Sequence, residues 1–170
     1  MRQNRIHLLI PLMFLGFFGM ESCLEVVTYP DEPRIGFERF NVLGNGGAEL
    51  VLTFTDGDGD VGLDQGDTLA PYCPEECSFY YNLFLEYYEL REGEWTHIEL
   101  DPQAGQIPFY YRVPRVEPSG QNPALNGEIK LDMPFYYLVS DYDTARFEIT
   151  LVDRALNVSN SVISRSFIKP

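Results

Sequence analysis

The chain has 170 residues, enough for one domain of ordinary size, and its 12 basic against 26 acidic residues leave a net charge of −14. So acidic a chain repels nucleic acid and anionic lipid headgroups, which excludes nucleic-acid binding as a function class. The sequence also contains no phosphate-binding loop and no dinucleotide fingerprint.

The N-terminus has the order of a secretory signal. Arg2 and Arg5 precede an uncharged apolar run, 8–20, and Ser22 and Cys23 follow it. The run is short for a membrane span, which needs roughly 20 residues. A cysteine at this place resembles the bacterial lipobox, which implies cleavage before Cys23 and lipidation of its thiol. The predicted division is a signal peptide over 1–22, a lipidated cysteine and tether over 23–33, and one domain over 34–170. An ordinary cleaved signal and an uncleaved anchor are the alternatives.

Apolar and polar residues alternate along the remainder of the chain, as in half-buried antiparallel strands. The alternation is clearest over 48–54 and 145–152, where Phe147, Ile149 and Leu151 share one face. Further strands are expected near 35–42, 79–90, 95–100, 108–113, 128–132 and 158–168, with a hairpin turn over 91–94. This pattern predicts an all-β fold, an antiparallel immunoglobulin- or fibronectin-like sandwich of about seven to eight strands.

Between the predicted strands over 48–54 and 79–90 lies a loop rich in aspartate and glycine, 56–67. Its carboxylates repel one another unless a cation lies among them, and oxygen ligands of this kind suit Ca²⁺. The spacing resembles an EF-hand loop, but Val61 stands where that loop needs glycine and Asp67 replaces a longer glutamate. The alternative is an Asp-Gly turn in which the aspartates bond their own backbone. The predicted metal ligands are Asp56, Asp58, Asp60, Asp64 and Asp67.

Cys73 and Cys77 are separated by three residues in Cys-Pro-Glu-Glu-Cys. Outside the cytoplasm such a pair is expected to form a local disulfide. A zinc site would need two more ligands, and the only histidine after the signal segment, His97, lies well away in sequence.

Three Phe-Tyr-Tyr triplets occur at 79–81, 109–111 and 135–137. Such rings either pack in a sandwich core or, if exposed, stack on sugars or proteins. His97 has no serine or cysteine beside it in a nucleophile motif, so we predict that the protein is not an enzyme. A cleft that gathers His97 with acids would favour an enzyme instead.

Four segments together resemble a group of uncharacterised Bacteroidota outer-membrane lipoproteins: 54–63, 111–114, 126–129 and 153–160. The resemblance implies a sandwich fold and an outer-membrane address, on the periplasmic or the surface face, but no activity. Two tripeptides that begin at Asp67 and Asp143 resemble the O-glycosylation pattern of that phylum, which implies modification at Thr68 and Thr144. The expected function is that of a lipid-anchored binding or structural accessory protein with a protein partner. The alternative is glycan binding through exposed Phe-Tyr-Tyr rings.

Overall fold

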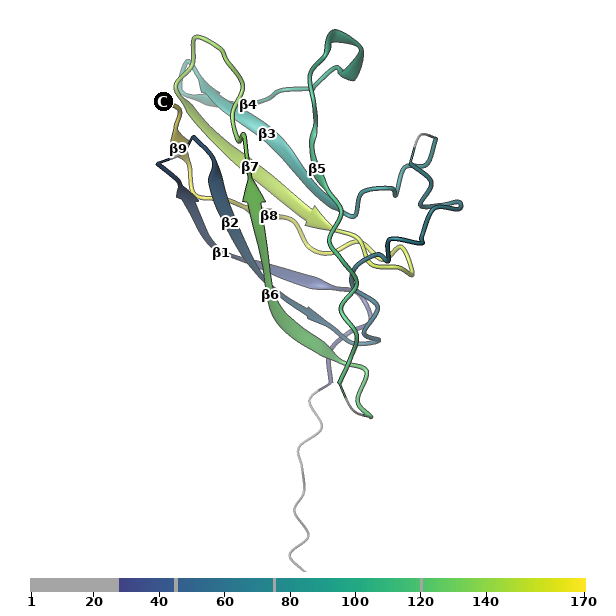
Figure 1. Cartoon of the computed structure of the whole chain (residues 1–170). Coiled ribbons are helices and arrows are strands. Elements are labelled where there is room, and N and C mark those ends of the chain that lie inside the picture. The colour runs from purple at the N-terminus through teal and green to yellow at the C-terminus, as the bar shows by residue number, and fades with distance from the viewer. Residues whose placement is uncertain (1–27, 45, 75, 120) are drawn as a thin grey trace, which may run out of the picture.

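The computed structural model describes residues 28–170 except 45, 75 and 120 (Figure 1). Residues 1–27 lie outside the described part of the chain. They include the predicted signal peptide over 1–22, the predicted lipidation site at Cys23 and the first part of the predicted tether.

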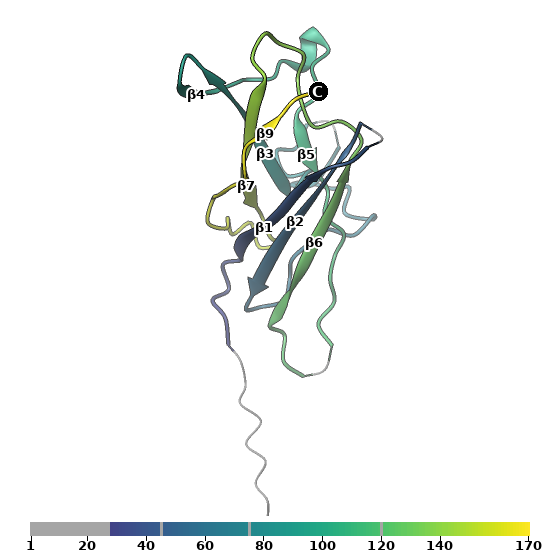
Figure 2. The same ribbon diagram turned by 90° about the vertical axis from the view of Figure 1, so that its left-hand side faces the viewer.

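The described chain forms an antiparallel β-sandwich, which confirms the predicted fold class. The smaller sheet has the strand order β1-β2-β6, and Figure 2 shows its three strands side by side. The larger sheet has six strands, with β4, β3, β7 and β8 in order, β5 also paired to β3, and β9 also paired to β7. Their bounds are β1 Arg34–Val42, β2 Ala48–Asp56, β3 Leu83–Arg91, β4 Glu94–His97, β5 Phe109–Tyr111, β6 Leu125–Met133, β7 Thr144–Leu151, β8 Val162–Ile163 and β9 Phe167–Ile168.

The chain crosses between the sheets as in immunoglobulin-type sandwiches. β2 pairs with β6 rather than with its neighbour in sequence, β3, which pairs with β7. The strand expected over 79–90 begins only at Leu83. The strand expected over 158–168 is divided into β8 and β9. Between them the Ser164 hydroxyl, in place of a backbone carbonyl, accepts the hydrogen bond from the Phe147 N–H of β7, which interrupts the ladder.

The core lies between the inner faces of the two sheets. Phe147, Ile149 and Leu151 of β7 are fully buried, as their alternation predicted, and they belong to the same core cluster as Leu50 and Leu52 of β2. Burial of each such side chain contributes about 1.5 to 3 kcal/mol. This packing fixes the relative position of the two sheets, and therefore of the loops that follow β2 and β7.

Candidate metal centre

The acidic loop begins at the last residue of β2. Asp56 is fully buried, and its Oδ2 accepts a hydrogen bond of 2.8 Å from the backbone N–H of Asp60. This bond closes a tight turn, so that Asp58 and Asp60 come back towards Asp56. Asp60 is half-buried and Asp58 is exposed. Local turn chemistry thus brings together three carboxylates that alternate in sequence.

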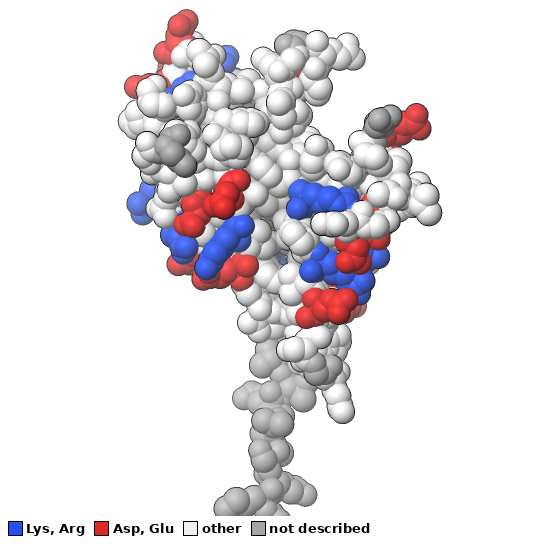
Figure 3. Space-filling model, viewed as in Figure 1, with Lys and Arg blue, Asp and Glu red and all other residues white. Residues whose placement is uncertain are grey.

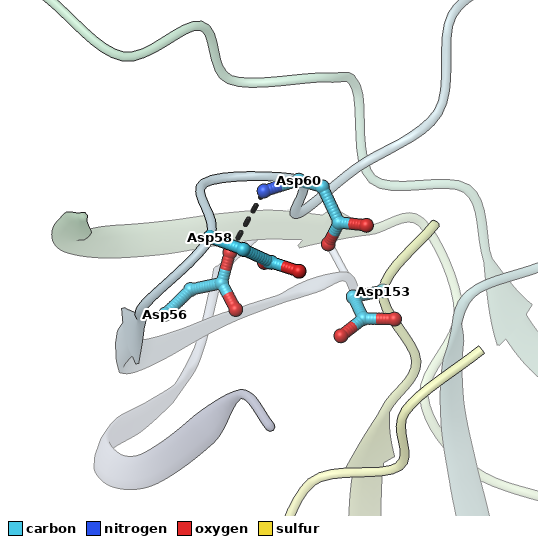
Figure 4. A group of neighbouring side chains, drawn as sticks. All are labelled: Asp56, Asp58, Asp60 and Asp153. Atoms are coloured by element: carbon cyan, nitrogen blue, oxygen red, sulfur yellow. Dashed lines mark hydrogen bonds between the residues drawn. The ribbon is translucent and has the colours of Figure 1, made fainter. Parts of the chain in front are cut away.

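A fourth carboxylate comes from the other sheet. Asp153 lies just after β7 and is buried, and it accepts hydrogen bonds from the backbone N–H and the side-chain amide of Asn157, at 2.8 and 2.9 Å. One oxygen of each of Asp56, Asp58, Asp60 and Asp153 lies within 4.8 Å of the others. Figure 4 shows the four side chains around a common space, with Asp153 on a separate segment of the chain.

The spacing of these oxygens suits a single cation. Because Ca–O bonds are about 2.3 to 2.6 Å long, two oxygens on opposite sides of one Ca²⁺ are about 4.6 to 5.2 Å apart. The four carboxylates could therefore all contact one ion, and the ion would connect the loop after β2 with the loop after β7.

Both the burial and the mutual repulsion of these groups oppose their ionisation. Burial, together with the nearby charges of Asp58 and Asp153, raises the pKa of Asp56 from 3.8 to about 6. Burial, and to a smaller extent the charges of Asp153 and Asp58, raises the pKa of Asp60 from 3.8 to about 6. Burial also raises the pKa of Asp153. The folded protein therefore places negative charge where it is unfavourable unless a positive charge lies close by.

Two oxygens of this group have no hydrogen-bond donor. Asp56 Oδ1 and Asp60 Oδ1 are both buried and unpartnered. Almost all buried polar atoms in native proteins have a partner, so an exception calls for an explanation such as an ion. Since Asp56 is fully buried and its second oxygen faces the other three carboxylates, a bound cation would satisfy it. The four aspartates thus form a group that could hold a metal ion.

Glycines let the acidic loop pack against neighbouring backbone. Gly59 has φ +75°, and a Cβ at this position would lie 2.1 Å from the carbonyl oxygen of Pro123. A Cβ at Gly57 would lie 2.3 Å from the carbonyl oxygen of Tyr29. The loop is therefore enclosed by the start of the described chain and by the long connection before β6, at one end of the sandwich (Figure 1).

Asp64 and Asp67 do not join the group, which differs from the EF-hand-like arrangement. Val61 and Leu63 are buried, and the backbone of Leu63 pairs with Val113 and Arg115. This pairing carries the chain away from Asp56 before residue 64 is reached.

Asp64 and Asp67 instead form ion pairs with arginines. Asp64 lies 3.2 Å from Arg115, and Asp67 pairs with Arg154. Although burial opposes it, hydrogen bonds from the Asp64 N–H and from Arg154 lower the pKa of Asp67. On the face in Figure 3, Lys and Arg lie beside Asp and Glu instead of forming a basic patch.

The remaining predicted sites lie elsewhere. A disulfide joins Cys73 and Cys77, as predicted, in the loop before β3. Thr68 is exposed in the same loop, whereas Thr144 begins β7 and is half-buried.

The Phe-Tyr-Tyr triplets divide between core and surface. Phe109 and Tyr136 are buried, while Tyr81 and Phe135 are each about two fifths exposed. The rings of Tyr81 and Tyr110 are inclined at 60° to each other, so they form no coplanar row.

His97 ends β4, and its Nε2 lies 2.9 Å from Glu86 Oε2. Both line a groove at the edge of β3 together with Glu99. This arrangement places a histidine beside acids, but no serine, threonine or cysteine is found among the described residues that line the groove.

Sequence reasoning did not identify Asp153 as a possible ligand. The only signal was its place in the segment 153–160, where it appeared as a turn residue.

No family model, no curated protein and no solved structure matches this chain. Within the described residues, no helix has the length and apolar character needed to cross a membrane.

Proposed function

We propose that this protein is an extracytoplasmic, calcium-stabilised β-sandwich that acts by binding a protein partner at the outer membrane, where a lipid on Cys23 anchors it. The observation that supports the metal most directly is the pair of buried, unpartnered oxygens on Asp56 and Asp60 within a group of four carboxylates. The signal-like N-terminus and the Cys73–Cys77 disulfide support an address outside the cytoplasm.

Calcium fits this group better than magnesium does. Ca²⁺ accepts six to eight oxygen ligands in flexible geometry, whereas Mg²⁺ keeps several waters and takes only one or two carboxylates. Four carboxylates on two segments, with Asp56 fully buried, match the ligand set that Ca²⁺ prefers.

The ion would act as a clamp between the two sheets. Asp56, Asp58 and Asp60 follow β2 of the smaller sheet, and Asp153 follows β7 of the larger one. Neutralising their repulsion would stiffen the end of the sandwich from which the described chain begins. A binding domain held by a tether at that end would keep its shape under the calcium concentrations outside the cell.

The test is thermal unfolding of the full-length protein in detergent, with chelator and then with Ca²⁺ or Mg²⁺. An ion that binds only the folded state stabilises it by about 2.7 kcal/mol at a hundredfold excess over Kd, which is several degrees in Tm. The shift should disappear in Asp153→Asn and persist in the control Asp132→Asn, which changes an exposed strand aspartate. A Tm that ignores millimolar Ca²⁺, with no heat in calorimetry, would refute the metal.

The anchor has its own test. Metabolic labelling with a fatty-acid analogue should mark the wild-type protein but not Cys23→Ala, and the variant should leave the membrane fraction or remain unprocessed. Three acyl chains would hold the protein firmly, whereas a single chain gives only marginal binding. Labelling that survives Cys23→Ala would remove the lipoprotein assignment.

A further inference from the structure

A groove of about 380 Å³ opens at the edge of β3. β4 and β5 pair with the same edge of β3, β4 opposite 88–91 and β5 opposite 83–85. Between them the chain leaves the sheet and returns, and Figure 1 shows this connection projecting away from the sandwich. The edge at Glu86 is therefore open between the two short strands. The volume falls within the usual range for ligand sites, about 300 to 1,000 Å³.

The lining of this groove combines apolar and acidic residues. Leu85, Tyr87 and Phe109 are nearly fully buried and form its floor. The apolar surface that a ligand could touch comes from partly exposed Ile98, Leu100 and Pro108. Glu86 and Glu99 contribute the acidic part. No lysine or arginine is among the described residues that line the groove.

The carboxylate of Glu86 is held in place before any ligand arrives. Its Oε1 accepts a hydrogen bond of 2.9 Å from the Tyr110 hydroxyl, and its Oε2 lies 2.9 Å from His97 Nε2. Burial, together with the hydrogen bond to Glu86, raises the pKa of Tyr110 to about 12, so the phenol stays a donor at neutral pH. Each carboxylate oxygen retains a second lone pair for a ligand. Such fixed groups reduce the ordering cost of binding.

This chemistry favours a cation on an apolar stem. Lysine and arginine bury their methylene stems against apolar surface and keep their charged heads among polar groups. The Tyr110 ring and the two carboxylates would all attract that head. The net charge of −14 would draw in basic partners and repel acidic ones.

The neighbouring rings argue against a neutral sugar as the occupant. Phe84 and Tyr110 stand edge to face at 69°, and Tyr80 and Tyr81 at 74°. A row of sugar rings needs aromatic faces that lie side by side in one plane, and these do not.

We propose that this groove captures a lysine or arginine side chain displayed by a protein partner. The proposal rests on the proposed role as a binding protein, for which it names the chemistry of the partner, but it does not depend on the metal. In the bound state the stem would lie against Ile98, Leu100 and Pro108, and the charged head between Glu86 and Glu99.

The test uses the calcium-supplemented, full-length protein in detergent and short capped peptides, followed by NMR titration and calorimetry. Ac-Ala-Lys-Ala-NH₂ and its arginine counterpart should shift resonances of groove residues in a saturable way. The norleucine and acetyl-lysine counterparts, which keep the stem but lack the charge, should bind at least roughly tenfold more weakly. Binding that does not distinguish lysine from norleucine would overturn the proposal.

Matched variants separate the groove from general charge attraction. Glu86→Gln keeps the shape and can still bond Tyr110, and it should weaken lysine-peptide binding roughly tenfold. Glu128→Gln removes the same charge from β6 and should leave binding unchanged. If Glu86→Gln does not fold, Glu99→Gln, at an exposed position, replaces it. An equal loss of lysine-peptide affinity in the groove variant and in the control variant would overturn the proposal. It would also be overturned if the neutral probe maltotriose shifted groove resonances and the lysine peptide did not.

These readouts also separate the two proposals. Loss of the Ca²⁺ effect on Tm with lysine-peptide binding intact would remove the metal alone. Intact Ca²⁺ stabilisation without peptide binding would remove only the groove's role.

Discussion

The metal-free protein should become more stable as the pH falls from 7 to 5, opposite to the usual acid destabilisation. The groups responsible are Asp56 and Asp60, whose pKa is about 6 in the folded protein against 3.8 ordinarily. Between these two values the folded state holds protons that the unfolded state releases. The free energy of unfolding therefore rises as the pH falls through 6, and the gain levels off near 3.8.

The magnitude follows from the pKa values. One carboxyl gains about 1.4 kcal/mol for each pH unit below its folded pKa. Protonating one of the pair relieves the repulsion on the other, so we expect about 2 kcal/mol for both at pH 5. For a domain of this size that is a rise in Tm of about 6 °C.

The pH window matters because other carboxyls act in the opposite direction. Although burial opposes it, hydrogen bonds from Ser140, Arg91 and Lys169 lower the pKa of Glu89 from its ordinary 4.5. The stability that Glu89 contributes is present above that value and is lost as the pH falls below it. Measurements between pH 5 and 7 therefore isolate the aspartate group.

The assay is circular-dichroism melting at pH 5, 6 and 7, at constant ionic strength, with chelator or with Ca²⁺. With Ca²⁺ bound the carboxylates stay ionised. At pH 7 the Tm should therefore be higher than that of the metal-free protein, and it should not rise on acidification. In the metal-free Asp56→Asn/Asp60→Asn variant most of the rise should disappear, because only Asp153 keeps a raised pKa. A metal-free Tm that stays level or falls between pH 7 and 5 would refute this reasoning, as would an unchanged slope in the variant.

Three further predictions concern the surroundings of the site and the rest of the fold. Gly59→Ala should cost about 3 kcal/mol and weaken Ca²⁺ binding in calorimetry, because its φ is +75° and its Cβ would meet Pro123; Gly66→Ala, with open space around it, is the control. Lys169→Met should lower Tm by about 10 °C, because it removes a partner 2.9 Å from fully buried Glu89; an unchanged Tm would show that Arg91 and Ser140 suffice to satisfy this carboxylate. Cys73→Ala/Cys77→Ala should cost about 2 kcal/mol or less in denaturant unfolding, because the closed loop is short, and Ca²⁺ stabilisation should persist; loss of that stabilisation would mean that the disulfide shapes the metal group.

The sequence alone was sufficient to predict the features that depend only on residues close together in the chain. Alternation along 145–152 identified the buried face of β7, because side-chain direction in a strand has a period of two. The Cys73–Cys77 pair was predictable because only a few residues separate its members. Asp56, Asp58 and Asp60 could be grouped because one tight turn holds them.

Three features were decided only by the tertiary structure. Asp153 reaches the acidic group because β2 and β7, in different sheets packed on one core, end on the same side of the sandwich. Asp64 and Asp67 turn to arginines because burial of the preceding apolar residues redirects the chain. The groove exists because β4 and β5 share one edge of β3. Sequence spacing cannot reveal such contacts, since they join segments far apart in the chain whose positions depend on how the two sheets pack.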